Sequence, residues 1–227
     1  VTVNGFVESA TIDAGGDIII TQGGMGKVND SGTEYSTILK SKGSVHVQHG
    51  QGLDITCKGN VTIGRQLAYS RITCTGKVTI GAVDNPNGNI FACTINCQDK
   101  VSAGTLGAVS GSNLSIDFSD GFNILLERKD TLDELLKEIK QNNSRHLDRI
   151  NIINSKFIPK DMQVRVDEAN KLFQNETQLL EWLENKAVEL NNSKENYQTD
   201  IMIIGNKRIY PGVFVKLNNR TSRADSE

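Results

Sequence analysis

The chain has 227 residues, enough for one large domain or two small ones with a buried core. Its 25 Lys and Arg residues nearly balance its 27 Asp and Glu residues, so no global basic field would attract nucleic acid or anionic lipid. No apolar run approaches the roughly 20 residues that a membrane-spanning helix needs. Aromatic residues make up only 5% of the chain while Gly occurs 21 times, which favours many short, tightly stacked elements.

The first half of the chain contains five similar windows of eleven residues, which are 10–20, 37–47, 53–63, 70–80 and 93–103. Apolar or small residues occupy the odd window positions, and the seventh position is Gly in the first four windows and Asp99 in the last. Period-two alternation predicts strands with one buried face. Recurrence of the same residue class at fixed offsets predicts stacked rungs, so we expect a right-handed parallel β-helix over residues 1–118. A β-sandwich, the alternative, explains the alternation but not the offsets.

Three of the four cysteines share one window position with small residues. The fifth position holds Ala14, Ser41, Cys57, Cys74 and Cys97. We interpret it as a crowded inner corner lined by free thiols, which behave as small hydrophobic groups. A zinc site or disulfides are the alternative, since Cys93 and Cys97 lie four residues apart. The histidines are not spaced with the cysteines, so we predict no metal and no cofactor. Reduced thiols fit a cytoplasmic protein.

The second half changes to a helical pattern that predicts an antiparallel coiled-coil hairpin over residues 119–197. One heptad seam comprises Leu132, Leu136, Ile139, Asn143, His146, Ile150, Ile153 and Phe157. After a break at Pro159, a second seam comprises Val166, Ala169, Phe173, Glu176, Leu180, Leu183, Ala187 and Leu190. Folding the chain back at Pro159 pairs the seams in a constant register, with Phe157 opposite Val166 at one end and Leu132 opposite Leu190 at the other.

Two features of the hairpin are candidate functional residues. The pair His146 and Glu176 forms a polar layer, interpreted either as a pH-sensitive switch or, in preference, as a layer that fixes the register. Trp182 lies one step off the second seam. It is our candidate for a partner contact, because exposed Trp is enriched at binding hot spots. Packing of a partly exposed Trp182 against its own hairpin is the alternative, and the sequence alone favours it.

After the hairpin, residues 200–204 and 212–217 read as two strands around the turn Tyr210-Pro211-Gly212. Two strands cannot stand alone, so we expect residues 198–218 to return and pack on the β-helix. We expect the polar residues 219–227 to form a disordered tail.

The order of these features resembles the bacterial flagellar assembly protein A family. The residues that carry the resemblance are the Gly-x-Val-x-Ile rungs, Val101–Gly107, the charged helical pair and Ile209–Val213. The resemblance implies a non-enzymatic, cytoplasmic scaffold, the cell pole included, that supports flagellar assembly and its polar placement or regulation. It implies flagellar, cell-pole or regulatory protein partners, with homo-oligomers left open. Because Val1 already lies in an expected strand, we also expect a region to precede it, and the resemblance implies that this region holds part of the partner binding.

Two other functions remain as alternatives. A self-polymerising β-helix like bactofilins or the division inhibitor MinC would stack through its open ends. A polysaccharide-active enzyme would need paired carboxylates on an outer groove, and the outward window positions show none. Binding of nucleic acid and a membrane span are not expected.

Overall fold

The computed structural model describes residues 1–224, which form two compact units. Unit 1 comprises Val1–Asn123 and the segment that begins at Tyr197, and unit 2 comprises Ile124–Asn196. Unit 1 holds all the strands, and unit 2 holds most of two long helices.

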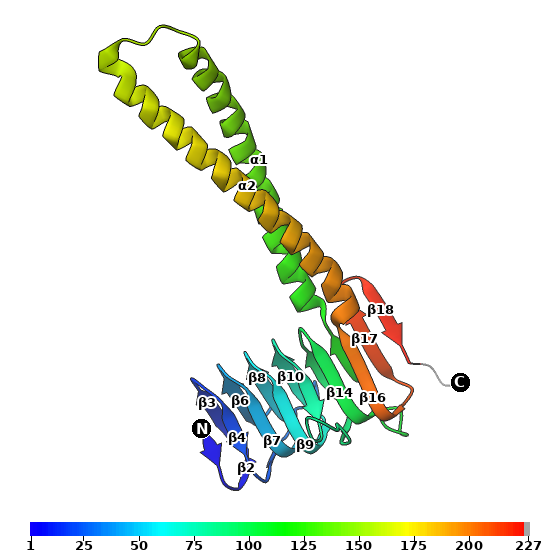
Figure 1. Ribbon diagram of the computed structural model, residues 1–227. Helices are drawn as coiled ribbons and strands as arrows, with labels where there is room; N and C mark the ends of the chain where they lie inside the picture. The colour runs from blue at the N-terminus through cyan, green and yellow to red at the C-terminus, as the bar shows by residue number, and fades with distance from the viewer. Residues whose placement is uncertain (225–227) are drawn as a thin grey trace. The chain divides into compact units, whose positions relative to one another are not determined.

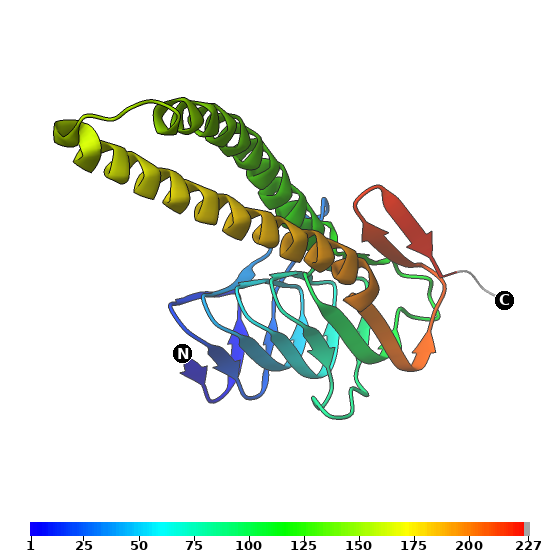
Figure 2. The ribbon, with the colours of Figure 1, turned by 45° about the horizontal axis from the view of Figure 1, so that its top comes forward.

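Unit 1 consists of two sheets of short strands (Figures 1 and 2). The ten-stranded sheet contains β1 (Thr2–Val3), β2 (Phe6–Glu8), β4 (Ile18–Ile20), β5 (Gly23–Met25), β7 (Val45–Gln51), β9 (Val61–Ala68), β11 (Val78–Ile80), β12 (Asn89–Phe91), β14 (Lys100–Leu106) and β16 (Met202–Ile209). The eight-stranded sheet contains β3 (Thr11–Ala14), β6 (Thr37–Ser41), β8 (Leu53–Cys57), β10 (Arg71–Cys74), β13 (Thr94–Asn96), β15 (Leu114–Asp117), β17 (Val213–Leu217) and β18 (Arg220–Arg223).

The register between neighbouring strands follows the sequence windows residue by residue. The third window positions pair through parallel strands in the order Ile12, Leu39, Ile55, Ile72 and Ile95. The ninth positions pair in the order Ile18, Val45, Val61, Val78 and Val101. Each window is therefore one rung, with a strand in each sheet, and the predicted parallel stacking is confirmed.

The core of unit 1 lies between the sheets. Residues at the third, ninth and eleventh window positions point inward, and most of them are fully buried. Alternate residues point outward, because successive side chains of a strand face opposite sides of the sheet. Strand pairing fixes this alternation, so the small and branched apolar residues of one rung pack on those of the next.

The helices α1 (Ser119–Asn154) and α2 (Gln163–Asp200) are joined by a connection that contains a short 3₁₀ helix, Lys160–Met162. Contacts between them are ordered along both helices: Lys140 meets Glu184 at 2.6 Å, Asn143 meets Thr177 at 3.3 Å, and His146 meets Glu176 at 2.8 Å.

The prediction that Phe157 packs on Val166 is wrong. Phe157 is 94% exposed, whereas Val166 is 9% exposed. The helix α1 ends at Asn154, where the hydroxyl of Ser155 donates to the carbonyl of Ile152. Pro159 disfavours helical backbone only at Ile158, and α1 already ends four residues earlier, so the heptad pattern runs past the true end of the helix.

The chain returns from α2 to the strands of unit 1, and both sheets gain a strand. β16 pairs in parallel with β14, and β17 pairs in parallel with β15. The prediction of a disordered tail is wrong for residues 220–223, which form β18 antiparallel to β17. Ladder hydrogen bonds to β17 order this polar segment without a buried apolar face. The rest of the predicted tail includes residues 225–227, which lie outside the described residues.

The two helices are inserted at one definite place in a rung. In earlier rungs a short bend connects the two strands of a window, and it contains Gly in the first four windows, as between β8 and β9. The helices stand at the corresponding place between β15 and β16. Phe118 lies between β15 and α1 and is only 1% exposed, so it is the last core residue of unit 1 before α1 begins.

Candidate interaction surfaces

The predicted polar layer of unit 2 is brought together in the structure. The Nδ1 atom of His146 lies 2.8 Å from Oε2 of Glu176, and their side chains are 48% and 23% exposed. One turn away, Asn143 donates to the hydroxyl of Thr177, which itself donates to the carbonyl of Phe173. These polar contacts can only form in one alignment of the helices, which agrees with a register role, and that role stays a prediction.

Beside this layer the helices leave a cavity of about 420 Å³. Its lining combines apolar and polar side chains, which are His146, Arg149, Ile150, Ile153, Ala169, Leu172, Phe173 and Glu176. The apolar seam is therefore incompletely filled here, unlike at Leu136 and Leu183, which are buried. Figure 2 shows α1 and α2 diverging toward their connection.

Trp182 is exposed on the surface of α2. Its side chain is 55% exposed, and the ammonium group of Lys186 lies 5.9 Å from the centre of its ring. A cation at this distance contacts the ring face by a cation–π interaction. Trp182 thus contacts its own helix through Lys186 and is still largely exposed, and its role as a partner contact stays a prediction.

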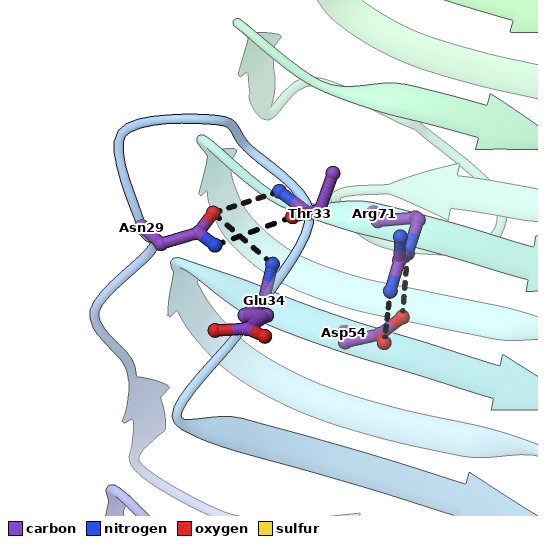
Figure 3. A network of polar contacts seen from close by, with 5 residues as sticks. All are labelled: Asn29, Thr33, Glu34, Asp54 and Arg71. Carbon is purple, nitrogen blue, oxygen red and sulfur yellow. Dashed lines mark hydrogen bonds and ion pairs between the residues drawn. The ribbon is translucent and has the colours of Figure 1, made fainter.

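A polar cluster that the sequence reasoning missed lies on the outer face of the eight-stranded sheet (Figure 3). Arg71 on β10 pairs in register with Asp54 on β8, and its guanidinium donates two hydrogen bonds to the carboxylate, at 3.1 and 2.6 Å. The guanidinium also lies 5.0 Å from the ring centre of Tyr35. Burial raises the pKa of the Tyr35 hydroxyl above its usual value, although Arg71 opposes this.

The segment that carries Tyr35 is folded by its own hydrogen bonds. The Oδ1 atom of Asn29 accepts from the backbone N–H groups of Thr33 and Glu34, at 2.9 and 3.2 Å, and its Nδ2 donates to the hydroxyl of Thr33 (Figure 3). Val28 and Tyr35 form an antiparallel bridge. The cluster therefore holds this loop on the sheet, and its charged groups are already paired. Asp54 and Arg71 share the second window position, which is the signal that could have found them.

The cysteines are buried, free thiols. Cys57 and Cys74 lie side by side in register, at the corner position that the windows predicted. The thiol of Cys57 donates to the carbonyl of Gly59 and that of Cys74 to the carbonyl of Gly76. The interaction between the two neighbouring thiols lowers the pKa of Cys57 and raises that of Cys74. Burial raises the pKa of Cys93 and of Cys97 to about 12. Cys93 and Cys97 therefore stay protonated and inert at neutral pH.

Residues 1–224 contain no group of three or more His, Cys, Asp or Glu side chains arranged to hold a metal ion. Neither described helix combines the length and apolar character needed to cross a membrane.

Comparison with known proteins gives one positive result. The family model described as the flagellar assembly protein A β-solenoid domain matches residues 1–227, the whole chain. No curated protein and no solved structure matches the chain.

Proposed function

Because the chain belongs to the flagellar assembly protein A family, we propose that it is a non-enzymatic scaffold that supports flagellar assembly, through polar placement or its regulation. The observation that carries this proposal is the match of the family model over the whole chain. The β-solenoid supplies a rigid base, and the helical insertion supplies a second surface for protein partners.

We further infer that the helices form an antiparallel coiled-coil hairpin and that the solenoid is right-handed. Three cross-helix contacts support the first point, since they pair residues whose numbers fall along α1 as they rise along α2. Crossover connections between parallel strands of one sheet are right-handed in nearly all proteins, which supports the second. Buried free thiols favour a reducing compartment and hence the cytoplasm, the cell pole included.

Trp182 is the residue that we expect to contact a partner. A large ring held by Lys186 in an exposed position offers apolar area at low entropic cost. Truncation of such a ring at an interface typically costs about 2 kcal/mol of binding free energy or more.

The test is complementation in a flagellated bacterium that lacks its own copy of the gene. The Trp182→Ala variant should leave fewer flagella, or flagella displaced from the pole, by electron microscopy. The Val188→Ser variant is the matched control, because Val188 is similarly exposed on the same helix. Full complementation by Trp182→Ala would remove Trp182 from the partner surface. Normal flagella without the protein would contradict the scaffold proposal itself.

Self-polymerisation is the competing function. β18 covers the outer edge of β17 and obstructs stacking of a second solenoid there. We therefore expect the purified chain to stay in the supernatant on ultracentrifugation. Filaments in the pellet would favour the cytoskeletal alternative.

A further inference from the structure

The connection between α1 and α2 exposes apolar side chains that no part of the described chain covers. Phe157 is 94% exposed in this connection, and Met162 is 46% exposed. On the adjoining helix ends, Ile152 is 54%, Val164 is 66% and Leu172 is 69% exposed. Scattered exposed apolar residues are normal, but an almost fully exposed Phe beside several exposed aliphatic residues marks a binding surface.

Basic residues outnumber acidic ones in the sequence around these apolar residues. We call residues 144–172 the distal segment. Its six cations are Arg145, Arg149, Lys156, Lys160, Arg165 and Lys171. Its four acidic residues are Asp148, Asp161, Asp167 and Glu168. The rest of unit 2 has the opposite balance, with six cations and ten acidic residues. The near-neutral charge of the whole chain therefore conceals a basic region at one end of the helical pair.

The cations of the distal segment are not neutralised internally. The ion pairs formed within residues 1–224 involve none of the six. Lys156 and Lys160 lie in the connection itself, on either side of Phe157. Positive charge on flexible side chains next to exposed apolar groups suits a surface that is both anionic and apolar.

We propose that the connection between α1 and α2 docks on the surface of an anionic lipid bilayer. Phe157 and its aliphatic neighbours enter the boundary between headgroups and acyl chains, while Lys156 and Lys160 remain at the level of the lipid phosphates. A second copy of the chain is a poorer occupant, because two distal segments would bring like charges together. An acidic protein could neutralise the cations, but a compact apolar loop flanked by two lysines matches the depth of the lipid interface.

The test is co-sedimentation of the full chain with lipid vesicles. Vesicles that contain about a third phosphatidylglycerol should bind the chain, pure phosphatidylcholine vesicles should bind it at least tenfold more weakly, and salt should reduce the binding. Lys156→Glu with Lys160→Glu should weaken it at least about 25-fold, since each lost basic residue costs about fivefold and each new carboxylate is repelled by the anionic surface. Phe157→Ser should weaken it about tenfold.

Matched variants separate the distal segment from the rest of the chain. Lys58→Glu with Lys137→Glu makes the same change of charge elsewhere, and Val109→Ser removes an apolar side chain that is 84% exposed in unit 1. Both controls should bind as the unchanged chain does, and circular dichroism should be unchanged in every variant.

Insertion is measured directly with Phe157→Trp in a Trp182→Phe background, which leaves one Trp in the chain. Its emission should shift to the blue on anionic vesicles. The proposal is overturned if anionic vesicles do not bind the chain, as expected for an acidic protein partner. It is also overturned if the distal variants bind as their controls do, or if the emission of Trp at position 157 does not move.

Discussion

The hydroxyl of Tyr197 donates a hydrogen bond of 2.9 Å to the backbone carbonyl of Phe118, which lies 79 residues earlier in the chain. The ring of Tyr197 also stacks on that of Phe122, with 6.4 Å between their centres. This contact ties the last turns of α2 to the first turn of α1, at the point where the helices leave the rungs. The contact therefore joins the two ends of the inserted helical segment within unit 1.

Removing this hydroxyl should destabilise unit 1. In Tyr197→Phe the carbonyl of Phe118 loses its side-chain donor while the ring stack remains, so the free energy of unfolding should fall by about 1 kcal/mol. Denaturant unfolding followed by circular dichroism measures the change. Tyr69→Phe is the control, because Tyr69 is 53% exposed and stacks edge-on against Phe91, and it should shift the free energy by less than about 0.5 kcal/mol. Equal shifts in the two variants would contradict the role of the hydrogen bond.

A charge inside the rungs should prevent folding of unit 1. Val61 is fully buried between its rung neighbours, so Val61→Asp would bury an unpaired carboxylate at a cost of several kcal/mol. That cost is comparable with the whole stability of a typical domain. Thr62→Asp, one residue along β9 and pointing outward, should fold normally by circular dichroism and gel filtration. A soluble, folded Val61→Asp protein would show that this position tolerates water.

A substitution between the helices should unfold the helical pair while the strands of unit 1 stay folded. Phe173 is half-buried and lines the cavity between the helices, so Phe173→Asp should loosen their packing. Hydrogen exchange measured by mass spectrometry should show lost protection over residues 124–196 and retained protection in the strands, because each rung depends on its neighbours. Gln174→Asp places the same charge on the exposed face and should change neither region. Simultaneous loss of protection in both units would contradict the prediction that the two units unfold independently.

Alkaline pH should destabilise the protein through its buried thiols. Burial raises the pKa of Cys93 and Cys97 from 9.0 to about 12, so between these values the unfolded chain releases protons that the folded chain keeps. Stability is therefore unaffected by these groups below pH 9 and falls as the pH rises toward 12, by up to about 1.4 kcal/mol per pH unit for each thiol.

The variant that isolates this effect is Cys97→Ala, since Ala14 occupies the same window position in another rung. Its free energy of unfolding should fall less steeply with pH than that of the unchanged chain. Denaturant titrations on both sides of pH 9 supply the comparison. If the free energy of unfolding fell equally steeply with pH in the two proteins, ionisation of Cys97 would not destabilise the folded state.

The rungs could be predicted because their signal repeats. The same residue class at a fixed offset gave the register of Ile12, Leu39 and Ile55 before any contact was known. The pairing of His146 with Glu176 followed in the same way from two heptad seams. Periodic patterns of this kind report which neighbours a residue must have.

The remaining contacts could not be predicted, because they join segments without a common period. Tyr197 and Phe118 meet only because the inserted helices begin and end next to each other. Tyr35 contacts Arg71 only because the hydrogen bonds of Asn29 fold the loop that carries it. Helix ends are equally local, so the seam overran α1 at Phe157. The basic distal segment was hidden because charge was summed over the whole chain.

Because the helices are inserted at a bend of a rung, their length can change without altering the pairing of the strands. The helices replace a bend between β15 and β16, and the strands on both sides still pair in parallel with the preceding rung, β16 with one register shift between Ala103 and Thr105. Seven residues added to each helix would lengthen the pair by about 10 Å without disturbing any rung. The length of the helical pair can therefore change over evolution while the rungs of unit 1 stay the same.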